Sequence, residues 1–390
     1  MAQREFIAGP NFSGRSAALR EALQRDAAAG GTFYIGPYAE AALSGLTSSV
    51  RDEILLYRHR LASEKTAFEL PIDAEAHTRD PQSLSGGEQV LLALHCFSQS
   101  AYTRIAIDTA LEQLDPANRA TALAYLGSTA DSAILIDNRA PPEHWDVTQQ
   151  PAATPAFVID WQKLAELTEP QTASRLAISG LNFSYGGGKS IFANAAVALE
   201  PGQAYRVAGA NGAGKTTFFK LLVGALVPGG AEMTLGDKHY EPWRDGNRAL
   251  ALATQNPDQQ WCGATLAEDM ARRRKALAKA STVNRLAPER LSELSAALGV
   301  LSLDAHLYEL PLAARKRLSW SWPFAGVHPW IMLDEPTVGQ DRATRDALAK
   351  HMALLCARGY GVMFVTHDDN FAAQLPHHVL TVADRALRLA

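Results

Sequence analysis

Short runs of apolar residues stand at matching places in the two halves of the chain. In the N-terminal half they are Ile-Ala-Ile-Asp at 105–108 and Ile-Leu-Ile at 134–136. In the C-terminal half they are Trp-Ile-Met-Leu-Asp at 330–334 and Val-Met-Phe-Val at 362–365. Runs this short and apolar, separated by helical stretches, are typical of parallel strands that helices cover on both faces. The pattern predicts an α/β protein in which one order of strands and helices occurs twice.

A proline-rich stretch separates the two halves. Residues 140–175 hold five prolines among small polar residues, a composition typical of a linker. We therefore predict a first domain over residues 1–147, a linker over 148–174 and a second domain over 175–390. Within the linker, Phe-Val-Ile-Asp-Trp at 157–161 is compatible with a short strand or a docking segment.

The composition narrows the class of protein. The 390 residues are 47% hydrophobic and 20% charged, as in an ordinary soluble protein, and the net charge of −4 argues against a dedicated nucleic-acid binder. The three cysteines lack metal-ligand spacing and indicate a reducing compartment. The sequence shows no signal-peptide pattern and no apolar window long enough to span a membrane. We expect a cytoplasmic protein that reaches a membrane only through a partner.

One glycine-rich segment has the spacing of a phosphate-binding loop. Gly-Ala-Asn-Gly-Ala-Gly-Lys-Thr-Thr at 209–217 matches the pattern G-x-x-x-x-G-K-[ST], and it stands between an apolar run and a helical one. Its backbone amides can turn inward around an anion at the helix N-terminus. Lys215 can reach the β- and γ-phosphates of a nucleotide, and the Thr216 hydroxyl suits Mg²⁺. The predicted nucleotide ligands in this loop are Gly209, Asn211, Gly212, Gly214, Lys215, Thr216 and Thr217.

Two further motifs lie in different halves of the chain. The C-terminal half ends its apolar strand with Asp334 and Glu335, a pair of acids that is costly to bury without a function. A Leu-Ser-Gly-Gly-Glu segment stands in the N-terminal half at 84–88, where Ser85 is a natural helix N-cap. The corresponding place in the C-terminal half reads Leu-Pro-Leu-Ala-Ala at 310–314.

The order and spacing of these motifs resemble the ATP-binding cassette (ABC) family of ATPases, and the resemblance covers nearly the whole chain twice. It implies that Asp334 holds Mg²⁺ and that Glu335 polarises the attacking water, two roles that hydrolysis needs at different points. It also implies that His367, in Val-Thr-His-Asp, is the switch histidine that contacts the γ-phosphate.

The resemblance assigns two more positions in the C-terminal half. Gln255, in Thr-Gln-Asn-Pro-Asp-Gln-Gln at 254–260, would touch Mg²⁺ and water. This segment, the Q-loop, is also where ABC ATPases receive a membrane subunit. Tyr185 resembles the aromatic residue that stacks on adenine. Val-Gly-Gln-Asp at 338–341 resembles the D-loop.

The N-terminal half keeps the Mg²⁺ aspartate of the family pattern at Asp108 but departs from the pattern at four other chemical positions. Gly-Pro-Asn-Phe-Ser-Gly-Arg-Ser at 9–16 is a phosphate loop in outline, with Arg15 in place of the lysine. Pro37 falls at the Q-loop glutamine, Thr109 at the catalytic glutamate and Asn138 at the switch histidine. These four changes predict that this half has lost hydrolysis.

The Leu-Ser-Gly-Gly-Glu segment at 84–88 resembles the signature segment of the family. The family pairs its ATPase domains head to tail, so that the signature segment of one domain covers the nucleotide bound by the other. On this arrangement Ser85, Gly86, Gly87 and Glu88 complete the intact site of the C-terminal half. The opposite site would combine the altered positions of the N-terminal half with 310–314, where side chains replace both signature glycines. We therefore predict two P-loop NTPase domains in tandem, paired within one chain, with one competent ATP site.

The Gln-Asn-Pro-Asp-x-Gln form of the Q-loop resembles the ATPases of energy-coupling factor (ECF) importers of vitamins and metals. The resemblance implies ATP and Mg²⁺ as cofactors, a transmembrane coupling subunit and a membrane-embedded substrate-binding subunit as partners, and a place on the inner face of the cell membrane. Two alternatives stay open: the fused nucleotide-binding subunit of another ABC importer or exporter, and a soluble ABC ATPase of the translation-factor or DNA-repair type. Glu335 and His367 argue against a non-enzymatic scaffold.

Overall fold

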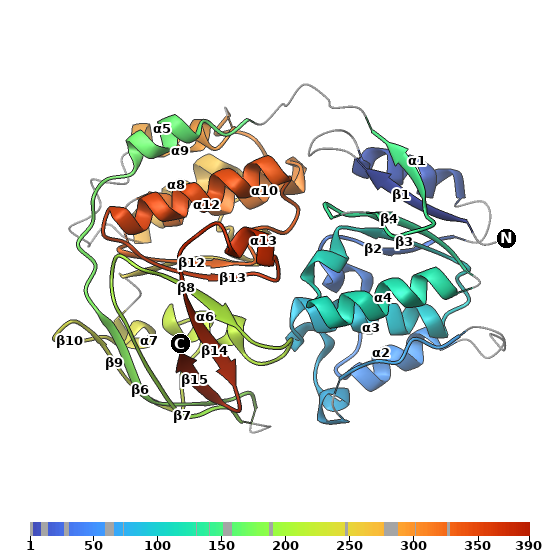
Figure 1. Ribbon diagram of the computed structural model, residues 1–390, viewed down its shortest axis with the longest axis horizontal. Helices are drawn as coiled ribbons and strands as arrows, with labels where there is room; N and C mark the ends of the chain where they lie inside the picture. Colours follow the sequence, from blue (N-terminus) through green and yellow to red (C-terminus); the bar gives the residue numbers. More distant parts are fainter. Residues whose placement is uncertain are drawn as a thin grey trace. The chain divides into compact units, whose positions relative to one another are not determined.

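The computed structural model divides into two compact units, Met1–Pro155 and Ala156–Ala390, called here the first and the second unit. Figure 1 colours the first from blue to teal and the second from green to red. The described residues are 3–8, 15–26, 31–58, 66–72, 74–129, 131–139, 141–150, 158–186, 190–245, 249–276, 288–300, 302–325 and 328–390.

The first unit is built on one five-stranded sheet. Its strands are β1 (Arg4–Ala8), β2 (Phe33–Ile35), β3 (Arg104–Asp108), β4 (Ser132–Ile136) and β5 (Asp146–Gln149). Its α-helices are α1 (Arg15–Asp26), α2 (Val50–Tyr57), α3 (Gly86–Gln99) and α4 (Pro116–Ser128), and its 3₁₀ turns are η2 (Ala39–Ala42), η3 (Ala74–Thr78), η4 (Pro81–Ser83) and η5 (Ala110–Gln113). The strand order is β2-β3-β4-β1-β5, and every pairing is parallel.

Helices cover both faces of this sheet because alternate strand residues point to opposite sides. Ala106 and Ile134 belong to a buried cluster with Leu19 of α1 on one face. Ile105 and Ile107 belong to the larger cluster that includes the apolar side of α3 on the other. The parallel sheet predicted from the apolar runs is therefore confirmed in this unit.

The second unit contains two sheets. Its strands are β6 (Leu176–Ser184), β7 (Ser190–Leu199), β8 (Ala204–Ala208), β9 (Gly230–Leu235), β10 (Lys238–His239), β11 (Leu250–Ala253), β12 (Trp330–Asp334), β13 (Gly361–Val365), β14 (His378–Ala383) and β15 (Ala386–Leu389). The six-stranded sheet has the order β11-β12-β13-β8-β14-β15 and is parallel up to β14. The other sheet, β10-β9-β6-β7, is antiparallel.

The helices of the second unit lie on both sides of the six-stranded sheet (Figure 1). They are α5 (Trp161–Leu167), α6 (Lys215–Leu222), α7 (Pro242–Asp245), α8 (Leu266–Ala276), α9 (Pro288–Ala297), α10 (Leu312–Ser319), α11 (Ser321–Phe324), α12 (Arg342–Ala357) and α13 (Asp369–Ala372), with 3₁₀ turns η6 (Pro257–Gln260) and η8 (Leu307–Glu309). Trp330 and Met332 face a core shared with α6 and the antiparallel sheet. Ile331 and Leu333 face a core shared with α9 and α12.

The central sheets of the two units have the same strand order. β2, β3, β4, β1 and β5 take the places that β11, β12, β13, β8 and β14 have in the second unit. The registers also agree, because Asp108 pairs with Ile136 as Asp334 pairs with Val365. Equivalent positions can therefore be read from the strand ends of the two units.

The segment 148–174, expected as a linker, holds structure that belongs to both units. Strand β5 runs to Gln149 and pairs with β1 of the first unit. Helix α5 begins at Trp161, preceded by residues 158–160, and its N-cap residue Asp160 donates its N–H to the Ala297 carbonyl of the second unit. The division of the chain falls inside the segment, and residues 151–157 lie outside the described part. Among the described residues, no helix combines the length and apolar character needed to cross a membrane.

Candidate functional site

A glycine-rich loop joins β8 to α6 in the second unit. Gly212 has φ of 76° and Gly214, the N-cap of α6, has φ of 105°, conformations that favour glycine. A Cβ at Gly209 would lie 2.5 Å from the Val382 carbonyl oxygen, and one at Gly214 would lie 2.6 Å from Ile191 Cγ2. The loop therefore requires glycines, and it ends at the N-terminus of α6, the kind of position where anions bind.

Polar side chains of the loop surround this helix end. Lys215 Nζ donates hydrogen bonds to the carbonyls of Gly209 at 2.8 Å and Ala210 at 3.0 Å, which keeps its positive charge over the loop. Asn211 Nδ2 is buried without a hydrogen-bond partner among the described residues. Thr217 Oγ1 lies 3.1 Å from the hydroxyl of Tyr185. The loop thus presents donors of the kind that phosphate oxygens accept.

Asp334, a predicted Mg²⁺ ligand, is the last residue of the central strand β12. Thr216 Oγ1 donates a hydrogen bond of 2.8 Å to Asp334 Oδ2. Asp334 is 2% exposed, and its Oδ1 is buried and accepts no hydrogen bond within the described part of the chain. Burial raises the pKa of Asp334, although the Thr216 hydroxyl opposes that rise. A cation at Oδ1 would favour the charged carboxylate.

These groups fit Mg²⁺. A hydroxyl and a carboxylate are the hard oxygen ligands that this ion prefers, and it takes its other ligands from water and substrate phosphates. No cluster of three or more metal-binding side chains occurs among the described residues. The Thr216–Asp334 pair offers two oxygen ligands to such an ion.

Glu335 occupies a left-handed backbone position directly after β12. Its φ is 45°, and its N–H donates to the Val365 carbonyl at 3.1 Å, which fixes the turn to the end of β13. Its side chain is buried, and Oε1 lies 3.5 Å from Nε2 of His367. Non-glycine residues held at positive φ concentrate at functional sites. The turn thus brings the two predicted catalytic side chains together.

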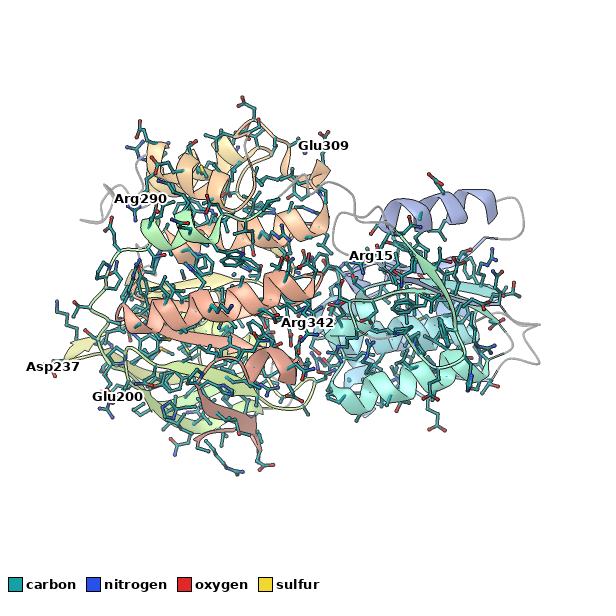
Figure 2. All side chains as sticks on the ribbon, turned by 45° about the horizontal axis from the view of Figure 1, so that its top comes forward. Arg15, Glu200, Asp237, Arg290, Glu309 and Arg342 are labelled. Atoms are coloured by element: carbon teal, nitrogen blue, oxygen red, sulfur yellow. The ribbon has the colours of Figure 1, made fainter. Side chains whose placement is uncertain are left out.

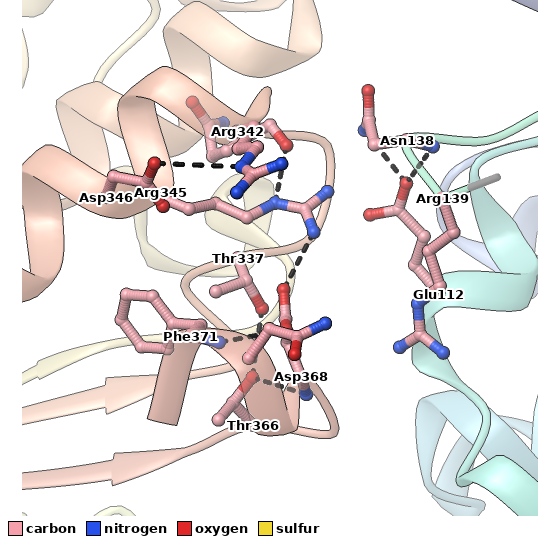
Figure 3. A network of polar contacts seen from close by, with 12 residues as sticks. Glu112, Asn138, Arg139, Thr337, Arg342, Arg345, Asp346, Thr366, Asp368 and Phe371 are labelled. Atoms are coloured by element: carbon pink, nitrogen blue, oxygen red, sulfur yellow. Dashed lines mark hydrogen bonds and ion pairs between the residues drawn. The ribbon is translucent and has the colours of Figure 1, made fainter. Parts of the chain in front are cut away.

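The loop that carries His367 is tied to helix α12 (Figure 3). Thr366 Oγ1 lies 3.0 Å from Thr337 Oγ1, and the Asp368 N–H donates to Thr366 Oγ1 at 3.1 Å. Arg345 donates to Asp368 Oδ2 at 2.8 Å from Nη1 and to the Gln340 carbonyl at 2.7 Å from Nε. Arg345 therefore links the histidine loop to the D-loop segment, a role the sequence analysis did not assign.

The Q-loop follows β11 at the same edge of the sheet. Ala253 pairs with Leu333, so Gln255 and Asp334 each come just beyond the last pair of the two strands. The loop then closes through η6, whose N-cap is Asn256. Gln255 is half-buried, and its backbone carbonyl accepts a hydrogen bond from Lys316 at 2.8 Å.

Tyr185 follows β6 at the rim of the glycine-rich loop. Its ring packs edge-on against Phe183 at a centroid distance of 4.8 Å, and 36% of the residue is exposed. Its hydroxyl bonds to Thr217, the third residue of α6. An aromatic face therefore remains partly open beside the loop.

The signature residues belong to the first unit. Ser85 caps α3 as predicted: its Oγ accepts from the Glu88 N–H, while the Ser85 N–H donates to Glu88 Oε2 at 2.8 Å. Gly86 and Gly87 form the first positions of the helix, where backbone amides have no intrahelical partner. In the second unit, Pro311 is the N-cap of α10 and its side chain makes no capping bond.

The altered positions of the first unit occupy the equivalent strand ends. The sheet registers show which positions of the two units are equivalent. Pro37 is equivalent to Gln255, Thr109 to Glu335 and Asn138 to His367. Arg15, labelled in Figure 2, begins α1 and donates to Asn138 Oδ1 at 2.8 Å and to the Asp137 carbonyl at 3.2 Å. The rest of the expected phosphate loop, residues 9–14, lies outside the described residues.

The second unit thus joins a glycine-rich loop, a helix N-terminus and a buried Asp-Glu-His group on a parallel sheet. Its geometry defines a P-loop nucleotide-binding protein. A family model described as "ABC transporter" matches residues 192–338. The cobalt import ATP-binding protein of Rhodobacter capsulatus is 30% identical over 212 residues, which cover 52% of this chain and 74% of that protein. The chain belongs to the ABC transporter ATP-binding family, whose members hydrolyse ATP to drive transport.

Two other relatives extend the comparison. An energy-coupling factor transporter ATP-binding protein of Methanothermobacter thermautotrophicus is 26% identical over 217 residues, 53% of this chain and 67% of that protein. A putative ABC transporter ATP-binding protein of Streptomyces coelicolor is 34% identical over 189 residues, 48% of this chain. The match spans 32% of the Streptomyces protein, so this chain spans about a third of the length of that relative.

Proposed function

We propose that this chain is the ATP-hydrolysing subunit of an ABC-type membrane transporter, with one competent ATP site. The observation that carries the proposal is the buried group of Asp334, Glu335 and His367 beside the glycine-rich loop. Burying two adjacent acids without a catalytic or metal-binding role would be costly.

The roles of the residues follow from their positions. The amides of the loop and Lys215 bind the phosphates of ATP, and Tyr185 stacks on the adenine. Glu335 orients a water molecule and accepts its proton as the water oxygen bonds to the γ-phosphorus and the bond to the β–γ bridging oxygen breaks. His367 contacts the γ-phosphate and Gln255 the attacking water. Mg²⁺, held by Thr216, Asp334 and Gln255, would neutralise charge on the phosphates.

The site is completed by the first unit. Ser85, Gly86, Gly87 and Glu88 of the signature segment would cover the nucleotide held by the second unit in a head-to-tail pairing. The pattern of changes supports this: the signature is intact where the catalytic positions are lost, and it is replaced at 310–314 where they are kept. Random decay would not sort the changes by site in this way.

We assign the transporter to the ECF type of importer, in which the chain sits on the cytoplasmic face of the membrane. The form of the Q-loop and the similarity to a cobalt import protein and to an energy-coupling factor protein support this subtype. The partners are then a transmembrane coupling subunit and a membrane-embedded substrate-binding subunit, and the cargo is a vitamin or a metal.

The test is affinity purification of the tagged chain from detergent-solubilised membranes of its own cells, with partners identified by mass and ATP hydrolysis measured on the product. We expect one multi-span protein, one small membrane-embedded protein and ATPase activity. Recovery of ribosomal or DNA-bound partners, or of none from membranes, would overturn the transporter assignment. Absence of hydrolysis with the partners present would overturn the ATPase assignment.

A further inference from the structure

Lys316 is buried inside the second unit and has no part in the roles assigned above. It lies on α10, the helix that follows the altered signature segment, and it is 1% exposed. Its Nζ donates to the carbonyls of Thr254 at 2.8 Å, Gln255 at 2.8 Å and Asp334 at 3.0 Å. An ammonium group has three N–H donors, so these three acceptors satisfy it completely.

The three carbonyls belong to two segments that separate at this point. Strands β11 and β12 pair up to Ala253 and Leu333, and the chain then departs into the Q-loop on one side and the Asp334–Glu335 turn on the other. Carbonyls at such a divergence lose their sheet partners, and leaving them buried and unbonded would be costly. Lys316 bonds to both segments beyond the last strand pair, and it therefore holds the Q-loop and the Asp334–Glu335 turn together where the sheet hydrogen bonds end.

Charge also favours a lysine here. Burial lowers the pKa of Lys316 to about 8, whereas the negative charges of Asp334 and Glu335 favour its protonated form. The ammonium, which donates to the Asp334 carbonyl, thus brings a positive charge close to the two acidic residues of the site.

Helix α10 is itself bound to the Q-loop and the D-loop, which keeps Lys316 in place. Arg315 forms an ion pair with Asp258, and Gln260 Nε2 donates to the Ser319 carbonyl at 3.2 Å. Arg317 donates to Gln340 Oε1 at 3.0 Å. A helix whose N-terminus has lost its signature residues is thus still built into the intact site of its own unit.

We propose that Lys316 is a positioning residue that fixes the Q-loop backbone at Gln255 against the Asp334–Glu335 turn, so that the water- and metal-facing side chains keep their spacing. This inference rests on the proposed ATPase function. It gives the altered signature helix a role within its own unit, separate from any contact with nucleotide.

The test compares Lys316→Met, Lys316→Gln and the wild-type full chain, with Lys350→Met as the matched control. Lys350 lies on α12 and is exposed, so its substitution removes the same charge without touching the site. Turnover is measured per nucleotide-binding-competent molecule, and amide hydrogen exchange is followed over residues 254–260.

For Lys316→Met we expect a loss in kcat of about 100-fold, the effect of a displacement near 1 Å in a catalytic group, with KM for ATP within about threefold. Exchange over 254–260 should accelerate. Lys316→Gln keeps two N–H donors and should therefore recover part of kcat and part of the exchange protection over 254–260. If Lys316→Met does not fold, Lys316→Gln serves as the test variant. Lys350→Met should match the wild type.

Two results would overturn the inference: kcat within about twofold of wild type in folded Lys316 variants, or unchanged exchange over residues 254–260. A wild-type chain without turnover would count against the proposed function instead. The exchange measurement would still decide whether Lys316 holds the Q-loop, because it does not depend on hydrolysis.

Discussion

The two units keep one backbone and differ in the chemistry placed on it. Thr109 has φ of 57° and Glu335 has φ of 45°, and each donates its N–H to the last residue of the neighbouring strand, Ile136 or Val365. A β-branched residue at positive φ is a conformational outlier. The first unit therefore has the same strained turn as the second, with a threonine in the place of the glutamate. The backbone frames of the two units agree at a position where their side chains differ.

The polar groups at the equivalent strand ends also differ in what they contact. In the second unit, Glu335 and His367 face each other across 3.5 Å. In the first unit, Asn138 Nδ2 and N–H donate to Glu112 Oε1 at 2.8 and 2.9 Å, and Asn138 Oδ1 accepts from Arg15. These hydrogen bonds join Asn138 to two other side chains of the same unit. The first unit therefore has a hydrogen-bonded network at the place where the second unit has the Glu335–His367 contact.

The signature helices show the reverse difference. Helix α3 begins with a capping box built by Ser85 and Glu88, whereas α10 begins at Pro311 with no side-chain cap. The first unit thus has the capped helix start and lacks the residues proposed for hydrolysis, and the second unit has the reverse combination. The comparison teaches that, under the proposed head-to-tail pairing, each unit would supply the part of the site that the other lacks.

The sharpest way to break this comparison is to substitute the residue at this turn in each unit, Glu335 in the second and Thr109 in the first. Glu335→Gln should lower kcat about 1000-fold, since general base catalysis contributes about 10²–10⁴ to rate, while ATP still binds. Thr109→Ala should leave kcat within about twofold of wild type. Steady-state ATPase rates and nucleotide titration of the two variants measure both effects. Equal losses would mean that the two units contribute alike, and the asymmetry would be wrong.

Sequence patterns predicted the sheets and the main motif positions for physical reasons. Apolar runs such as 330–334 must be buried on both faces, and glycines such as Gly214 are fixed by a backbone that no other residue adopts easily. Ser85 was predicted as an N-cap because its hydroxyl satisfies an amide that the helix leaves open. These features depend on local chemistry, which the sequence carries directly.

Contacts between distant segments could not be predicted in the same way. Lys316 stands in the run Arg-Lys-Arg at 315–317, and a run of cations normally indicates a solvated helix face. Its burial depends on carbonyls of residues 62, 61 and 18 positions away. The link from Arg345 to Asp368 likewise joins a helix to a loop 23 positions further on. Helix α5 lies within the expected linker and packs against α9 and α12. Because these partners come much later in the chain, the local sequence did not predict the helix.

A second prediction tests whether the signature of the first unit acts on the site of the second. Ser85→Arg should lower kcat about 100-fold, the effect of losing one transition-state donor, because the larger side chain displaces the capped helix start from the phosphate. The matched control is Pro311→Arg at the N-cap of α10, which should stay within about twofold since no capping bond exists there to lose. ATPase assays on both variants, with thermal unfolding to confirm folding, decide between them. Normal hydrolysis by Ser85→Arg would exclude the head-to-tail pairing.

The smallest expected effect concerns the base of the nucleotide. Tyr185→Ala should raise KM for ATP about tenfold with little change in kcat, because stacking of a base on an aromatic ring contributes about 1–3 kcal/mol and does not change in the transition state. Tyr185→Phe is the matched control: it keeps the ring, loses only the hydroxyl contact with Thr217 and should keep KM within about threefold. Comparing ATP with inorganic triphosphate as competitors for binding separates the base from the phosphates. If Tyr185→Ala leaves KM unchanged, adenine binds elsewhere. If the alanine variant loses ATP affinity but keeps that for triphosphate, Tyr185 of the second unit recognises the base, and the difference between the units extends from hydrolysis to recognition.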